Sequence, residues 1–323
     1  MKILVTGGFG LIGANVVKRL SNEGHQVILF DKEIDRSTDF FVGSENIKYI
    51  EGDLTNQFTL SSLFANDQFD AIVHSAANLN GEYCKMNPID AVQLNTMGTL
   101  SLLELARIHG VNKFIYVGSG SVFGKQTTME PIDERAEVTP MNTYATTKRL
   151  SEELVRCYRV NYGMDATTIR VSWVFGPLPK LKVPRWNSGP VAYYTYKVLS
   201  ENNLNEPSGS DFIANFTYID NVIDGIVCLL NTNNAPEFVH LSSEQLYSTK
   251  EIVDFLMSKL PNSEIYVGEG AEPFELQAPM RGALVSNYKD QIGFKPNEDL
   301  KESLEEYFYW MKRELEKRNV RYV

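Results

Sequence analysis

The strongest constraint on this chain is a set of three glycines, spaced three residues apart, directly after its first apolar run. Residues 2–6 read Lys-Ile-Leu-Val-Thr, which is typical of a short buried parallel strand, and Gly7, Gly10 and Gly13 follow. Glycines admit positive φ and let backbone N–H groups approach a pyrophosphate. Residues from about 11 to 23 then predict a helix. Strand, glycine turn and helix in this order indicate a dinucleotide-binding unit.

Short apolar runs recur through the first half of the chain, separated by helical patterns. Strands that alternate with helices are typical of an α/β fold with a doubly wound parallel sheet, the Rossmann arrangement. Further strands are expected at about residues 26–31, 47–51, 70–74, 113–117 and 166–171, and long helices at about residues 88–109 and 144–162.

The alternating pattern degrades after Gly176 and Pro177, where proline, aromatic, Asn and Ser residues become frequent. We therefore expect two parts. The NAD-binding type of Rossmann domain would comprise residues 1–172 plus about 216–242. A smaller C-terminal substrate lobe would comprise about 173–215 plus 243–323.

Composition argues against several functional classes. The 323 residues carry a formal net charge of −10, with a pI of about 5.1, which disfavours nucleic acid and anionic membrane surfaces as partners. No apolar run approaches about 18 residues, so no membrane span is expected. Three cysteines without a C-x-x-C pair indicate reduced thiols in a cytoplasmic protein. The four histidines lack ligand spacing, so no metal site is expected.

Asp31 ends the second expected strand, about 20 residues beyond the glycine turn. A carboxylate there holds the ribose diol of a dinucleotide and repels the 2′-phosphate of NADP, which favours NAD as the cofactor. Lys32 adjoins Asp31 and would weaken that repulsion. The alternative is an Asp that only caps a turn, and the preceding glycine motif disfavours it.

Tyr144 and Lys148 lie four residues apart in an expected helix and therefore share one face. A nearby ammonium group favours the phenolate, so we expect Lys148 to lower the pKa of Tyr144 toward neutrality. Such a phenol removes a hydroxyl proton while hydride leaves the same carbon. The spacing alone is weak, because a surface Tyr beside a solvated Lys is common. The glycine motif favours the catalytic interpretation.

Other short motifs occur in a fixed order between these two. They are Asp53-Leu54, His74-Ser75-Ala76-Ala77, Asn95-x-x-Gly98-Thr99 and Ser119. The ordered set resembles an extended short-chain dehydrogenase/reductase, and more narrowly the NAD-dependent sugar epimerase/dehydratase family. The resemblance covers nearly the whole chain. It is specific for fold and cofactor, and much less so for substrate.

The resemblance implies a role for each matching residue. Ser119 would hydrogen-bond the substrate oxygen, Tyr144 would be the acid and base, and Lys148 would bind the nicotinamide ribose. The implied cofactor contacts are Gly7, Gly10, Leu11, Ile12, Gly13, Asp31, Lys32, Asp53, Leu54, Ala76, Ala77, Asn95, Tyr144 and Lys148. The implied substrate contacts are Ser119, Ser121, Tyr144, Trp173 and Arg281. The resemblance also implies a homodimer that pairs the helices at about 88–109 and 144–162.

The chain departs from the family pattern in two places. Sugar dehydratases carry Asp-Glu directly after the catalytic hydroxyl residue, whereas this chain has Gly120 and Ser121, which argues against loss of water. Nucleotide-sugar epimerases usually have Asn at Trp173 and often Arg at Ala214, both for the diphosphate. Arg281 stands at a plausible second diphosphate position. A free or differently activated sugar therefore remains an alternative to a nucleotide sugar.

Three functions follow from these observations. The leading hypothesis is an NAD-dependent epimerase of a sugar or nucleotide sugar that works through a transient keto intermediate and retains its cofactor. The second is an NAD-dependent dehydrogenase or reductase of a sugar-derived alcohol, with the cofactor exchanged at each turnover. The third is a non-catalytic NAD sensor. Intact Ser119, Tyr144 and Lys148 argue against the sensor.

Overall fold

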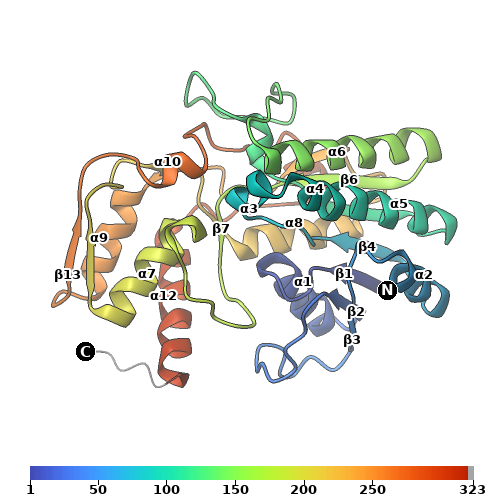
Figure 1. Ribbon diagram of the computed structural model, residues 1–323, viewed down its shortest axis with the longest axis horizontal. Helices are drawn as coiled ribbons and strands as arrows, with labels where there is room; N and C mark the ends of the chain where they lie inside the picture. Colours follow the sequence, from blue (N-terminus) through green and yellow to red (C-terminus); the bar gives the residue numbers. More distant parts are fainter. Residues whose placement is uncertain (319–323) are drawn as a thin grey trace.

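The computed structural model describes residues 1–318, which form a sheet domain and a smaller lobe side by side (Figure 1). Seven parallel strands build the sheet in the order β11-β6-β5-β4-β1-β2-β3. The strands are β1 (Lys2–Thr6), β2 (Gln26–Asp31), β3 (Ile47–Glu51), β4 (Ala71–His74), β5 (Lys113–Val117), β6 (Asp165–Arg170) and β11 (Phe238–His240). The predicted doubly wound parallel sheet is confirmed.

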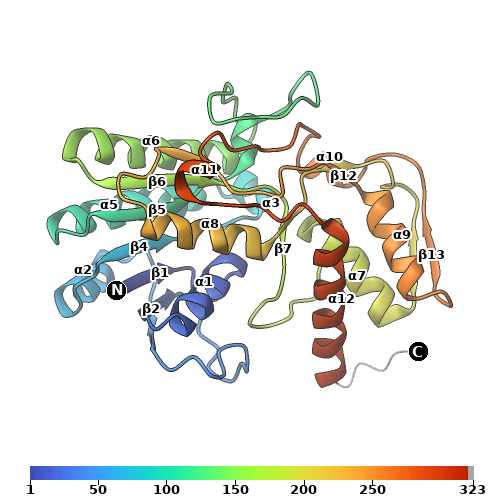
Figure 2. The same cartoon turned by 180° about the vertical axis from the view of Figure 1, so that it is seen from behind.

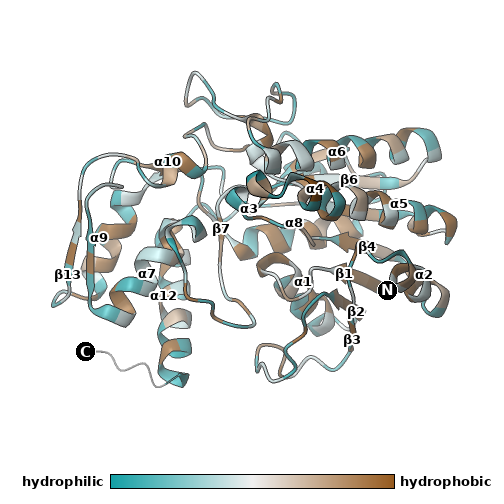
Figure 3. Cartoon of the chain, viewed as in Figure 1, coloured by the Kyte–Doolittle hydropathy of each residue, from teal (hydrophilic) through white to brown (hydrophobic). Residues whose placement is uncertain are grey.

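Helices cover both faces of this sheet, and alternate strand residues enter two separate cores. Ile3 and Val5 pack on the face of the sheet that α1 (Leu11–Asn22) and α8 (Ile219–Asn231) cover. Figure 2 shows these two helices on the near side of the sheet. Leu4 packs on the other side, against α2 (Gln57–Asn66), α5 (Gly98–Ile108) and α6 (Thr143–Tyr162). Because both faces are covered, the middle of β1, which is Ile3, Leu4 and Val5, is fully buried and apolar, and Figure 3 shows this strand as hydrophobic. Within residues 1–318, no helix is long and apolar enough to span a membrane.

The smaller lobe packs three helices, α7 (Pro190–Glu201), α9 (Thr249–Lys259) and α12 (Leu300–Lys317), around one another (Figure 1). Short strand pairs accompany them: β8 (Asn203–Glu206) with β13 (Glu264–Val267), and β9 (Ile213–Ala214) with β12 (Tyr247–Ser248). A third pair, β7 (Val174–Phe175) with β10 (Thr217–Tyr218), joins the lobe to the sheet domain. Phe175 contacts Tyr218 and Tyr307 with ring centroids 5.4 and 5.6 Å apart, so one apolar core continues across the junction.

Two details differ from the sequence-based expectation. The long helix expected at 88–109 is a succession of α4 (Pro88–Ala91), a π-helical turn η1 (Val92–Met97) and α5. The segment that contains Leu284 and α11 (Lys289–Ile292), which we expected in the substrate lobe, lies instead on the sheet domain. Leu284 forms a β-bridge with Ile132, and α11 packs against α8. The remaining short elements are α3 (Gly81–Met86), η2 (Gly120–Phe123), η3 (Trp186–Ser188) and α10 (Phe274–Gln277).

Candidate active site

The glycine turn after β1 forms a cradle that has no room for side chains. Gly7 has a φ of 69°, and a Cβ there would lie 2.7 Å from the backbone nitrogen of Ala76. A Cβ at Gly13 would lie 2.1 Å from the carbonyl oxygen of Gly7. Both distances are shorter than real Cβ contacts, so only glycine permits this close approach of the turn, α1 and the loop after β4. Backbone at the start of α1 is left open to a pyrophosphate, as the motif requires.

Asp31 faces this cradle from the end of β2. Its carboxylate accepts a hydrogen bond from the backbone N–H of Phe9, inside the glycine turn, at 2.8 Å. Lys32 points elsewhere, because its Nζ pairs with Asp53 at 3.1 Å. Leu54 is buried in the core beneath. Asp31 is therefore the acidic residue next to the glycine turn, and the positive charge of Lys32 is paired with Asp53 and not with Asp31.

Asn95, in the π-helical turn, is buried and fully hydrogen-bonded. Its Oδ1 accepts from the backbone N–H of Asn78 at 2.7 Å, and its Nδ2 donates to Thr147 Oγ1 at 3.0 Å. These bonds tie the loop after β4, which contains Ala76 and Ala77, to helix α6. Direct contact of Asn95 with the cofactor stays a prediction. Its observed contacts position the two segments that flank the site.

Tyr144, Lys148 and Ser119 meet at the carboxyl edge of the sheet. Tyr144 and Lys148 lie one turn apart on α6, which Asn142 caps by accepting from the Ala145 N–H at 2.8 Å. The buried Lys148 donates from Nζ to the carbonyl oxygen of Val117, at the end of β5, at 2.7 Å. Ser119 follows two residues later. The structure therefore brings the three proposed catalytic residues together.

Burial is the largest influence on the pKa values of Tyr144 and Lys148. It raises the pKa of Tyr144 to about 12, and hydrogen bonding with Ser119 opposes the rise only in part. It lowers the pKa of Lys148 to about 8, which the negative charge of Glu152 partly opposes. The expectation that Lys148 brings the pKa of Tyr144 toward neutrality is wrong for this arrangement, because the ammonium group is directed to the Val117 carbonyl and Tyr144 is desolvated.

The predicted substrate residues surround the same edge. Arg281 is 8% exposed and forms no ion pair within residues 1–318; burial lowers its pKa to about 10, and its Nη1 donates only to Gly124 O at 3.5 Å. Trp173 has a φ of 39°, a strained value for a bulky residue, and contacts Phe212 edge-on with centroids 5.2 Å apart. Ser121 Oγ is buried without a hydrogen-bond partner in the described part of the chain.

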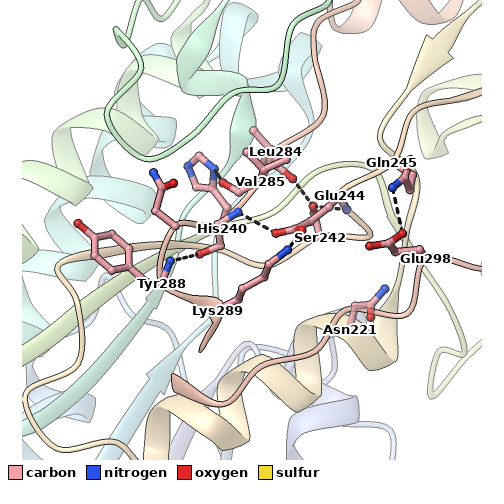
Figure 4. Close-up of polar contacts among 12 residues, drawn as sticks. Asn221, His240, Ser242, Glu244, Gln245, Leu284, Val285, Tyr288, Lys289 and Glu298 are labelled. Atoms are coloured by element: carbon pink, nitrogen blue, oxygen red, sulfur yellow. Dashed lines mark hydrogen bonds and ion pairs between the residues drawn. The ribbon is translucent and has the colours of Figure 1, made fainter. Parts of the chain in front are cut away.

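A seam of polar contacts that the sequence did not reveal joins the residues from β11 onward to residues 284–289, which follow Arg281 in the chain (Figure 4). Ser242 Oγ donates to the carbonyl of Leu284 at 2.6 Å, and Lys289 pairs with Glu244. His240 Nδ1 lies 3.1 Å from the Val285 carbonyl, so it must be the donor. These contacts join the segment that follows β11 to the segment that carries Arg281. No local sequence pattern connects residues about 40 apart in this way.

Fold and cradle together define a dinucleotide-dependent enzyme of the short-chain dehydrogenase/reductase type. The NAD dependent epimerase/dehydratase family matches residues 3–242, and the chain belongs to that family. The predictions of this family, of its fold and of NAD as the cofactor are confirmed.

Similar proteins and structures agree with this membership. The chain is 26% identical to an Arabidopsis thaliana GDP-mannose 3,5-epimerase over 336 residues, covering 99% of this chain and 85% of that protein. It is 26% identical to Arabidopsis thaliana UDP-glucuronate 4-epimerase 1 over 341 residues, covering 96% and 76%. The Thermus thermophilus UDP-glucose 4-epimerase, solved as a complex with NAD, superposes with a TM-score of 0.83 at 20% identity, covering 97% and 99%.

Cofactor choice provides a first test. Since Asp31 faces the turn and Lys32 is paired with Asp53, the dissociation constant for NAD should be at least about tenfold lower than that for NADP, or about 1.4 kcal/mol. Isothermal titration calorimetry measures both constants. Asp31→Asn should reduce the ratio of the NADP to the NAD dissociation constant. Lys32→Ala is the matched control and should leave that ratio unchanged. Equal affinities in the parent protein would show that Asp31 does not meet the ribose.

The role of Tyr144 provides a second test. Tyr144→Phe should lower kcat by roughly 10²–10⁴-fold, the usual contribution of a general acid or base, and leave the NAD dissociation constant unchanged. Because the phenol pKa is raised, parent turnover should increase with pH as the phenolate fraction grows. Tyr162→Phe, at the exposed far end of the same helix, is the control. Near-normal turnover in Tyr144→Phe would refute the assignment.

Proposed function

We propose that this protein is an NAD-dependent sugar epimerase that oxidises a carbinol carbon and then reduces the keto intermediate from its other face. The carrying observation is the assembly of Ser119, Tyr144 and Lys148 beside the glycine cradle. Gly120 and Ser121 occupy the positions at which elimination would need an acid and a base. Similar proteins named as epimerases support the same reaction.

Proton transfer is the work of Tyr144. The phenol of Tyr144 is close enough to Ser119 for a hydrogen bond between their side chains to affect its pKa. One substrate hydroxyl can therefore contact both groups. When bound in the glycine cradle, NAD would supply the hydride acceptor for the oxidation and the hydride donor for the reduction. Tyr144 takes the hydroxyl proton during oxidation and gives it back to the keto oxygen during reduction, so the enzyme ends each cycle in its starting protonation state. Lys148 would place positive charge one helix turn from the transient phenolate, although desolvation remains the larger influence on the pKa of Tyr144.

A buried cation without a carboxylate partner supports an anionic substrate. Desolvating a guanidinium group is unfavourable unless an anion or hydrogen-bond acceptors replace the water. Arg281 has only the long contact to Gly124 O among the described residues. We therefore propose a nucleotide-linked sugar whose diphosphate binds Arg281. Structures of similar fold have been solved with UDP-glucose and with UDP-N-acetylmuramic acid. Ala214 supplies no second arginine, so Arg281 would carry this contact.

A homodimer is also proposed. The outer surface of η1, α5 and α6 exposes apolar side chains, which are Met97, Ile108, Leu150, Val160 and Tyr162. Exposed apolar residues gathered on neighbouring helices are typical of protein–protein interfaces. The two helices of each subunit would form a four-helix bundle with those of the second copy. The site itself lies on the opposite end of α6, at Tyr144.

We further propose a cytoplasmic location. Cys84, Cys157 and Cys228 are all unpaired in the structure. Proteins of reducing compartments keep their thiols in this form.

Isotope transfer tests the reaction. A substrate deuterated at the reacting carbon should give epimerised product that retains the label, because hydride leaves and returns within one bound cofactor. NMR and mass spectrometry of products from a panel of UDP-sugars, GDP-sugars and free sugars measure this. Stoichiometric deuterium in released NADH would reject the epimerase and establish the alternative, a dehydrogenase of a sugar-derived alcohol. Turnover of free sugars alone would reject the diphosphate contact.

Light scattering tests the assembly. At micromolar concentration the parent protein should have the mass of a dimer, and Leu150→Glu should shift it toward monomer, because a charge would be buried in the apolar interface. Val42→Glu, at an exposed apolar residue remote from these helices, is the matched control. A monomeric parent protein would refute the proposal.

A further inference from the structure

A buried ion pair lies directly beneath the proposed catalytic residues. Glu152 follows Lys148 by four residues, so Tyr144, Lys148 and Glu152 succeed one another along the same face of α6. Glu152 is 0% exposed and Arg170, at the end of β6, is 1% exposed. Their contact is bidentate, with Oε1 3.1 Å from Nε and Oε2 3.0 Å from Nη2. Two fully desolvated charges therefore face the inner side of the site.

This pair touches the chain segment that carries the catalytic serine. A Cβ at Gly118 would lie 2.9 Å from Glu152 Oε1, so the backbone passes directly over the carboxylate. Gly118 separates Val117, whose carbonyl holds Lys148, from Ser119. A side chain at this position would separate the two segments.

Arg170 fixes the other end of the same segment. Its guanidinium lies 5.0 Å from the ring centroid of Phe123 and 4.4 Å from that of Phe238. Phe123 belongs to η2, the turn that Ser119 caps by accepting from the Ser121 N–H at 3.2 Å. The ion pair is thus in contact with both sides of Ser119.

Stability alone is a poor explanation for this arrangement. A buried ion pair loses hydration from both groups, and apolar residues of similar volume often stabilise a protein equally well. We propose that Glu152 and Arg170 are positioning residues for the proton transfer: the Glu152 carboxylate keeps the Lys148 ammonium group charged and seated on Val117, and Arg170 holds that carboxylate in place. This inference rests on the proposed function of Tyr144 and Lys148.

Electrostatics supports the geometry. The charge of Glu152 raises the pKa of Lys148 and that of Tyr144, against a background in which burial is the largest influence on both. Other groups face these two residues from every neighbouring element. Those near Tyr144 or Lys148 are Ser119 just before η2, Cys84 on α3, His74 on β4 and Tyr116 on β5, and those on Glu152 are Arg170 on β6 and Arg149 on α6, the latter at 3.5 Å. Glu152 is the acidic group among them.

The test measures the ionisation of Lys148 directly and needs no substrate. Protein labelled with ¹³Cε-lysine is titrated by NMR with NAD bound, and Lys148→Met assigns the resonance. Glu152→Gln removes the charge and keeps the shape, so the Lys148 titration should move to lower pH by about one unit, a tenfold change in the ionisation constant. Arg170→Met leaves the carboxylate unneutralised and should move it to higher pH. Glu153→Gln, a half-exposed neighbour, is the control and should not move it.

A further variant keeps the outcome decisive if a single variant does not fold. Glu152→Gln with Arg170→Met removes both charges of the buried pair, and Lys148 should still titrate at lower pH, because Glu152 and not Arg170 acts on Lys148. An unchanged titration in every folded variant that lacks the Glu152 charge would overturn the proposal, even if stability falls. Shifts as expected without epimerisation would instead refute the proposed function.

Discussion

Close approach of backbone segments at the carboxyl edge of the sheet is the constraint on which the rest of this structure depends. The turn after β1 touches the loop after β4 at Gly7 and the start of α1 at Gly13, with no space for a Cβ at either position. The same edge receives Asp31 from β2 and Lys148 from α6, whose ammonium group caps the end of β5. Because all seven strands of this sheet are parallel, their carboxyl ends meet on one side, and cofactor and substrate residues from distant parts of the chain converge there.

Much of this was predictable because it depends on local rules. The glycine spacing specifies a strand, a turn and a helix, and the four-residue interval between Tyr144 and Lys148 specifies a shared helix face. The paired contacts were not predictable. Lys32 joins Asp53 rather than Asp31, and the segment with Arg281 returns to the sheet domain across the Ile132 bridge. Such contacts depend on how separate elements pack, and one sequence carries no signal for them.

Glu152 shows where a local rule would have sufficed. It continues the same helix face by one further turn, so its position beneath Lys148 follows from spacing alone. Its bidentate contact with Arg170 on β6 could not be predicted from spacing, because that contact depends on how α6 packs over the sheet. The raised pKa of Tyr144 does not follow from spacing for a related reason. Sequence spacing identifies a neighbouring charge, whereas desolvation depends on every element that covers the residue, and here it is the larger effect.

Desolvation also makes this site a source of instability that the surrounding packing must offset. The pKa of Lys148 falls to about 8 in the folded protein from an ordinary value near 10.5. Between these two values the unfolded chain binds more protons than the native state, so the contribution of Lys148 to stability increases as pH rises through that window and is unfavourable below it. Tyr144 makes no such contribution near neutral pH, where it is protonated in both states. Keeping a lysine charged under the active site therefore opposes folding, and the carboxylate of Glu152 reduces that opposition at the place where the proposed chemistry needs the charge.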